Sequence, residues 1–271
     1  GNIGELAVNG TVNDVAMCGG RPKYLSLSFI LEEGLPMEAF KKVVHAAKKA
    51  ADHAGVQIVT GDTKVVEKGK GDKVFINTTG IGPMHPEADI ALSRVQQGDA
   101  LLISGPIAAH GMAILSEREG LEFESEILSD TACLSHMVLA LLDRFGPKVH
   151  LMRDPTRGGV SAVCTEIATD RGLGISLREA DIPLDRQVAA ACEILGLDPL
   201  YVANEGVVCV LVAPDIAEAA LEVMKQFPEG RSAVQIGSVV AEHPGQVVMQ
   251  SQVGGRRIVT PLLGEQLPRI C

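Results

Sequence analysis

Hydrophobic and polar positions change their spacing several times in the first part of the chain. Small and apolar residues recur at helical spacing from Ile3 up to the stop signals Gly19 and Gly20, which predicts a tightly packed helix. The run over residues 23–34 predicts a strand, and residues 36–55 predict an amphipathic helix with a solvated, lysine-rich face.

Two β-type runs come next, at residues 56–66 and 74–82, on either side of a turn-rich segment. Two such runs joined by a short polar turn predict a β-hairpin. We therefore expect one layered unit of helices and strands that ends near Gly82.

The pattern starts again after the linker-like residues 83–89. Strands and helices then alternate, which indicates α/β layers and leaves parallel, mixed and antiparallel sheets open. The predicted strands are 99–107, 149–159, 201–214, 233–240 and 246–250, and the predicted helices are 130–146, 160–172 and 216–228. The predicted fold class is α/β with two domains. We expect an N-terminal domain over 1–84, a C-terminal domain over 85–259 and a mobile tail over 260–271.

The charge pattern restricts the classes of binding partner. The formal net charge is −10, and no basic tract is clustered. Nucleic acid and anionic membranes would repel such a chain, so we expect it to bind neither. Phosphate would have to be handled locally, by metal ions or backbone amides. No run approaches the roughly 20 apolar residues that span a bilayer, and the first residues lack a signal-peptide pattern, so a cytoplasmic location is predicted.

Cysteine use points to one unusual residue. Six cysteines are scattered without a C-x-x-C pair, mostly within apolar runs. Buried free thiols in a reducing compartment account for five of them. The sixth, Cys271, is the last residue of the chain, where the backbone is usually least constrained. A thiol at the end of the chain either has no function or moves between different sites.

Asp14 is the first candidate for a chemical role. It lies between apolar neighbours in the predicted first helix. A carboxylate in such a setting needs a partner, because burial of an unpaired charge is costly. Asp14 is therefore either a capping acid or a ligand for Mg²⁺, which prefers carboxylate oxygens and substrate phosphates.

Asp62 and Lys64 form the second candidate, because alternation along a strand places them on one face while Thr63 points away. They are either an ordinary exposed pair or the edge of a phosphoryl-transfer site. In the second case the carboxylate would bind a metal ion, and the ammonium would bind a phosphate or move a proton. Gly61 favours this interpretation, because it allows backbone or ligand to approach closely.

The segment RDPTRGGV, at residues 153–160, predicts a turn that opens into a helix. Free amides at a helix N-terminus attract anions. The segment is either a capped helix start with an internal salt bridge or an anion site flanked by Arg153 and Arg157. It lacks the full pattern of a P-loop.

Glu205 stands at the mouth of a strongly apolar run and is followed by Gly206. Partial desolvation there would raise the pKa of the carboxyl group and suit it to proton transfer near neutral pH. The sequence Asn-Glu-Gly is equally typical of a simple turn.

Five segments together resemble the HypE family of hydrogenase maturation factors, within the ATP-binding superfamily typified by aminoimidazole ribonucleotide synthetase. They are GTVNDVAMCGGRP, TGDTKVVEKGKGDKVFINTTGIG, RDPTRGGV, VANEGV and the terminal PRIC. The likeness covers essentially the whole chain. The central motifs are shared loosely with selenophosphate synthetase and thiamine monophosphate kinase, and the PRIC end selects the family. The implied fold has an N-terminal mixed sheet with helices and a C-terminal α/β domain.

The resemblance also implies a reaction at the end of the chain. A partner carbamoyltransferase, HypF, would load a carboxamide onto Cys271. ATP would then drive dehydration of the S-carboxamide to an S-cyanide, which passes to an iron atom on a HypC–HypD scaffold for the nickel-iron hydrogenase site. An amide oxygen is a poor leaving group, so its phosphorylation by ATP explains the need for the nucleotide.

On the matching positions, the resemblance assigns Asp14 and Asp62 as ligands of Mg²⁺ beside ATP. Such a reaction also needs a cation near the transferred group and a base near the amide nitrogen. Lys64 and Glu205 are the candidates for proton removal and for orienting the carboxamide, and Cys271 carries the substrate.

Nucleotide contacts are assigned by the same resemblance to Asn13, Thr63 and Arg157. Family members pair as homodimers through the N-terminal domain, and a homodimer is expected here. They also carry a further strand and an acidic motif before the segment that corresponds to Gly1, so we expect this chain to begin inside the first domain.

Two rival classes of function stay open at this point. The chain could be another ATP-dependent ligase or kinase of the superfamily, in which Cys271 is incidental. It could also be a non-catalytic scaffold that docks partners through its tail. Activity on a carbamoylated tail peptide would separate the first from the proposed dehydratase, and a Cys271→Ala variant would separate the second.

Overall fold

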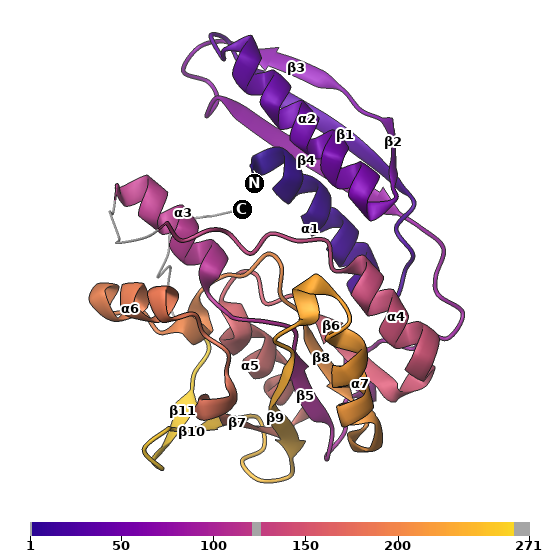
Figure 1. Cartoon of the computed structure of the whole chain (residues 1–271), viewed down its shortest axis with the longest axis vertical. Helices are drawn as coiled ribbons and strands as arrows, with labels where there is room; N and C mark the ends of the chain where they lie inside the picture. The colour runs from indigo at the N-terminus through magenta and orange to yellow at the C-terminus, as the bar shows by residue number, and fades with distance from the viewer. Residues whose placement is uncertain (1, 121–125, 263–271) are drawn as a thin grey trace.

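The computed structural model describes residues 2–120 and 126–262 of the 271-residue chain. Figure 1 shows a smaller sheet with two helices at one end of the molecule and a larger sheet with helices at the other. In chain order the helices are α1 (Ile3–Met17), α2 (Met37–Ala54), α3 (Ala109–Glu119), α4 (Ser135–Phe145), α5 (Gly159–Arg171), α6 (Arg186–Leu195) and α7 (Ala217–Met224). The strands are β1 (Tyr24–Glu32), β2 (Gln57–Thr60), β3 (Thr63–Val66), β4 (Val74–Ile81), β5 (Ala100–Ile103), β6 (Val149–Arg153), β7 (Gly174–Arg178), β8 (Cys209–Val212), β9 (Val234–Val240), β10 (Val247–Gln250) and β11 (Arg256–Val259).

The smaller sheet is built around β1. Strands β2 and β3 both run parallel to β1 along one edge, and β4 is antiparallel to β1 along the other. The predicted hairpin is therefore wrong, because its two arms lie on opposite sides of β1. The crossover through α2 explains the difference: it returns the chain parallel to β1 and leaves the other edge for β4.

Gly61 separates β2 from β3. A Cβ atom at this position would overlap the main-chain carbonyl oxygen of Leu27 in β1. The close approach predicted for Gly61 is thus an approach of backbone to backbone, which only glycine allows.

Helices α1 and α2 cover one face of the smaller sheet. Val8 and Val12 of α1 are fully buried against Leu25 of β1 and the alanine face of α2. At Gly4, a Cβ would overlap the carbonyl oxygen of Val43, so the two helices pack as tightly as the small residues predict. The opposite, outer face of the sheet carries exposed apolar side chains, among them Ile30 and Phe75.

The larger sheet has seven strands in the order β11-β10-β7-β9-β5-β8-β6. Among the strands in the described residues, only β10 and β7 of this sheet pair in parallel, so the sheet is mixed, which settles the alternative left open by the sequence. Helices α3, α5 and α6 contribute to the core on one face, and α4 and α7 to the core on the other. Strands β7 and β11 and helices α3 and α6 were not predicted.

Helix α1 also joins the two sheets. Ala16 and Met17, at its end, are buried in the core of α4 and α7. One turn earlier, the buried Asn13 donates its side-chain amide to the Ala132 carbonyl (3.0 Å) and accepts from the Leu134 amide (2.8 Å). The joint between the sheets is therefore packed and hydrogen-bonded. No helix in the described ranges is long and apolar enough to cross a membrane.

Candidate active site

Four carboxylates gather where α1 meets the larger unit: Asp14, Asp130, Asp154 and Glu205. Asp14 lies near the end of α1, and Asp154 follows β6. Partial burial and the charge of Asp154 raise the pKa of Asp14 above its ordinary value. Mutual repulsion makes such a cluster a place where a cation or a shared proton lowers the energy.

Glu205 is the most deeply buried predicted site residue in this cluster, with 8% of its surface exposed. Burial, followed by the charges of Asp154, Asp130 and Asp14, raises its pKa to about 7. A carboxyl group with this pKa can take up or release a proton at neutral pH. The desolvation expected from the sequence is therefore present, and the catalytic role itself stays a prediction.

Asp130 fixes the backbone beside Glu205. Its Oδ1 accepts a hydrogen bond of 3.0 Å from the main-chain amide of Glu205. A Cβ at Gly206 would overlap the carbonyl oxygen of Asp130, so glycine is required for this approach. Burial raises the pKa of Asp130 to about 6. Asp130 was not among the residues predicted from the sequence, because an Asp before a helix carries no spacing signal that separates it from an ordinary cap.

The side chain of Asn204 holds the turn after β6. The buried Asn204 side chain donates to the Pro155 carbonyl (2.8 Å) and accepts from the Ala108 amide (2.7 Å). Arg153 forms an ion pair with Glu166 of α5, and its charge partly offsets the burial that raises the pKa of Asp154. Asp154 lies close enough to Asp14 for its charge to contribute to the raised pKa of that carboxyl group. Arg157, the predicted nucleotide contact in this turn, is exposed.

Asp62, Thr63 and Lys64 lie elsewhere, on the exposed edge of the smaller sheet. Strand register places Lys64 opposite Ile30, on the outer face that α1 does not cover. Within the described parts of the chain, no hydrogen bond or ion pair joins these three residues to the carboxylate cluster, and no group of three or more His, Cys, Asp or Glu side chains is arranged to hold a metal ion.

The predicted residues thus form two sets in a single chain. Asp14 and Glu205 are brought together, and Asp62 with Lys64 forms a separate edge set. Both ends of the Asn13 amide are engaged with main chain, which gives that residue a bracing contact at the joint. Its predicted contact with nucleotide, like those of Thr63 and Arg157, stays a prediction.

A cavity of about 420 Å³ opens beside the carboxylate cluster. Asp14 and Asp154 line it together with apolar side chains from the larger unit. Its other lining residues are Met17, Cys18, Ile90, Ala91, Leu92, Leu151, Met152, Arg153 and Glu166. A lining that combines acidic with apolar side chains suits a nucleotide with its cation.

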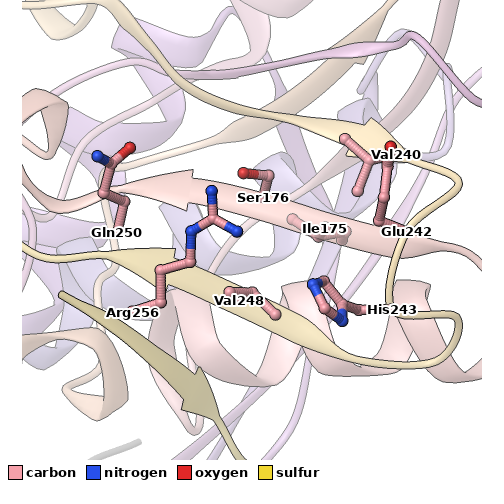
Figure 2. Close-up of a pocket in the computed structure, with 8 residues that line it drawn as sticks. All are labelled: Ile175, Ser176, Val240, Glu242, His243, Val248, Gln250 and Arg256. Atoms are coloured by element: carbon pink, nitrogen blue, oxygen red, sulfur yellow. The ribbon is translucent and has the colours of Figure 1, made fainter. Parts of the chain in front are cut away.

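A second pocket, of about 250 Å³, lies over β7 and β10 and contains none of the predicted residues. Figure 2 shows Gln250 and Arg256 at one end and Glu242 and His243 at the other, with Ile175 and Val248 between them.

The cysteines follow the prediction with one exception. Cys133, Cys164, Cys192 and Cys209 are buried, and burial raises the pKa of each thiol. Cys18, which was also expected to be buried, is exposed because it caps α1 at the mouth of the cavity. Cys271 and residues 263–270 of the predicted tail lie outside the described residues.

Comparison with known proteins identifies the family. Residues 1–84 match the AIR synthase related protein, N-terminal domain, and residues 96–250 match the AIR synthase related protein, C-terminal domain. The chain is 52% identical over 271 residues to the carbamoyl dehydratase HypE of Cupriavidus necator, covering 100% of this chain and 77% of that protein.

Solved structures agree. The crystal structure of hydrogenase maturation protein HypE in complex with ATP superposes with a TM-score of 0.95 at 49% identity and covers 100% of this chain and 82% of that one. A crystal structure of a HypE–HypF complex gives a TM-score of 0.93 at 46% identity and covers 97% and 85%. The predicted resemblance and the α/β fold class are thereby confirmed. The chain belongs to the HypE family of carbamoyl dehydratases, within the AIR synthase related proteins.

Proposed function

We propose that this chain uses ATP to dehydrate an S-carboxamide on Cys271 to an S-cyanide, the source of the cyanide ligand of nickel-iron hydrogenase. The observation that carries the proposal is Glu205, a buried carboxyl group whose pKa of about 7 suits proton removal at neutral pH. The relatives named carbamoyl dehydratase and the ATP complex of a related HypE support the same chemistry.

The proposed reaction has two steps, phosphorylation of the carboxamide oxygen and elimination of phosphate. The carboxamide oxygen attacks the γ-phosphate of ATP, and ADP leaves. One amide proton passes to solvent as the O-phosphorylated imidate forms. Glu205 then takes the second proton from the nitrogen, the C–O bond breaks, phosphate departs, and the carbon bound to the Cys271 sulfur becomes the C≡N group. The oxygen of the lost water ends in the phosphate.

Mg²⁺ fits the acidic side chains of this chain. Burial, and then repulsion by neighbouring carboxylates, raises the pKa of Asp14 and of Glu205, and a divalent cation would relieve that repulsion. We assign Asp14 and Asp62 as its ligands, and a bound cation would neutralise phosphate charge. Lys64 would orient the carboxamide, and Asn13, Thr63 and Arg157 would contact the nucleotide.

The separation of the two residue sets supports a homodimer as part of the proposal. Asp62 and Lys64 are exposed at the edge of the smaller sheet, and Lys64 lies opposite Ile30 of its outer face. Ile30 and Phe75 make the adjoining outer face apolar, which favours a contact between protein surfaces. A second copy packed on this face would bring its Asp62 and Lys64 to the cluster and complete the site.

The proposed partners are the carbamoyltransferase HypF, in keeping with the HypE–HypF complex, and a HypC–HypD scaffold that receives the cyanide. The four buried free thiols are in keeping with the proposed cytoplasmic location. We further propose an N-terminal domain over residues 1–84, a C-terminal domain over 85–259 and a mobile tail over 260–271.

Mass spectrometry tests the function directly. The chain is first given a carbamoyl donor system and then Mg-ATP, and Cys271 is expected to gain one carboxamide and then lose one water. Glu205→Gln should block the second step and leave the first intact. ATP turnover without a change in the mass of the Cys271 peptide would contradict the proposal.

A further inference from the structure

The root of the C-terminal tail is fixed by two hydroxyl groups. The Thr260 carbonyl accepts hydrogen bonds from Ser161 Oγ (3.1 Å) and from the Tyr201 hydroxyl (2.9 Å). Ser161 is fully buried in the first turn of α5. Tyr201 is the last residue of the short 3-10 helix Pro199–Tyr201. A single carbonyl held by two donors from different segments cannot rotate away without the loss of both bonds.

Further contacts hold these segments together. A side chain at Gly159 would overlap the Leu200 carbonyl, so α5 and the 3-10 helix lie in close contact. Asp198 caps the 3-10 helix by accepting from the Leu200 amide (3.0 Å), and it also pairs with Arg257 of β11. The last strand is therefore attached to the same two elements that hold Thr260.

Both donors lie on segments that carry carboxylates of the candidate active site. Ser161 follows Asp154 through the turn that opens α5, and Tyr201 precedes Glu205 on one continuous segment. The position of Thr260 is thus set relative to these carboxylates by the parts of the chain that position them. Cys271 follows Leu262 by nine residues, a span that reaches at most about 30 Å when extended.

We propose that Ser161 and Tyr201 are positioning residues that hold Thr260 as a fixed root, from which the tail presents the Cys271 carboxamide to Glu205. This inference rests on the proposed function. A fixed root limits the volume that a tethered group explores, which raises its effective concentration at the site. In this proposal a partner loads the carboxamide outside this site, so the rate of loading does not depend on the position of Thr260, whereas the rate of dehydration does.

Kinetics of the two steps test the inference. Tyr201→Phe removes one donor, and Tyr24→Phe, at the only other tyrosine of the chain, is the matched control. Loss of one hydrogen bond is expected to slow dehydration of the preloaded chain about fivefold. The double variant Tyr201→Phe with Ser161→Ala, which removes both donors, should slow it further. Loading and the KM for ATP should not change. Equal slowing of loading and dehydration, or no slowing of either, would overturn the proposal.

A distance measurement separates the root from the reaction. Nitroxide labels on Cys18, the exposed cysteine at the cavity, and on Cys271 report their distance distribution by pulsed electron paramagnetic resonance. Tyr201→Phe should broaden this distribution, and Tyr24→Phe should not. If the wild-type chain forms no S-cyanide but the broadening occurs, the proposed function fails and the anchoring role of Tyr201 stands. An unchanged distribution would overturn the anchoring role.

Discussion

The main-chain amide of Glu205 donates a hydrogen bond of 3.0 Å to Oδ1 of Asp130. This contact brings a second carboxylate next to a buried one, and the charge of Asp130 contributes to the raised pKa of Glu205, after burial and Asp154. The bond positions the Glu205 backbone, and the charge adjusts the protonation of its side chain. The two effects can be separated by substitution.

Asp130→Asn should shift the pH dependence of dehydration to lower pH. Asparagine keeps an oxygen that accepts from the Glu205 amide, but it removes the charge that raises the pKa of Glu205. Glu205 then ionises at lower pH and acts as a base there. The check is a pH–rate profile of the second step, with Asp130→Ala, which also loses the acceptor, as the comparison. An acidic limb that stays in place would contradict this account.

Relative to wild type, Glu205→Gln should stabilise the folded chain more at pH 8 than at pH 5. The pKa of Glu205 is about 7 in the folded chain and 4.5 for the ordinary group, so the folded state binds more protons between these values. Wild-type stability therefore falls as pH rises through this window, and the neutral glutamine does not share that loss. We expect a gain of about 1–3 kcal/mol at pH 8 in urea unfolding. An equal difference in the free energy of unfolding between variant and wild type at both pH values would contradict the raised pKa of Glu205.

Two glycines of α1 should respond to alanine in opposite ways. At Gly10 a Cβ meets nothing within 4 Å, and alanine should stabilise the helix by about 0.5–1 kcal/mol. At Gly4 the same Cβ would overlap the Val43 carbonyl, so alanine must push α1 away from α2 and destabilise the chain. The free energy of unfolding of the two variants measures both effects. A stabilising Gly4→Ala would show that the two helices separate at little cost.

Phe75→Glu should dissociate the proposed homodimer. Phe75 is half exposed on the outer face of the smaller sheet, and a charge there would have to be buried on pairing. Light scattering coupled to gel filtration reports the mass in solution. Ile194→Glu, at an exposed position on α6, is the control and should leave the mass unchanged. A wild-type chain that runs as a monomer would contradict the homodimer.

Mixing two inactive variants should restore part of the activity if the site is built across two chains. Lys64→Ala and Glu205→Gln chains each lack one residue, but a mixed dimer contains one site with both residues intact. The measurement is S-cyanide formation after subunit exchange, with each variant alone as the control. Full inactivity of the mixture would contradict the shared site and would mean that each site takes Lys64 and Glu205 from the same chain.

The elements with a clear period were predicted well. Helix α2, which ends at Ala54 before the left-handed Gly55, and strand β1 around Leu25 carry strong local signals. The hairpin was wrong because pairing depends on the crossover through α2, which no local pattern near residues 67–73 reports. Helix α3 was missed because it starts after Ala108, a left-handed residue that no local pattern predicts, and α6 starts after Asp185, whose side chain makes no capping hydrogen bond.

The candidate site was predicted only where a residue's own neighbours set its environment. Glu205 was found because an apolar run follows it directly. Asp130 was missed because its burial comes from Glu205 and Gly206, far away in sequence. The separation of Lys64 from Glu205 depends on which face of the smaller sheet α1 covers, and alternation along one strand gives the faces without saying which is covered.

The burial of Ala16 and Met17 under α4 and α7 makes the two halves of the chain interdependent. A fragment that begins after residue 84 would lose both side chains and expose an apolar hollow beside α4. The N-terminal half, for its part, would expose the end of α1 to water. Melting of one half therefore removes part of the core of the other, so heating should unfold both in a single calorimetric transition.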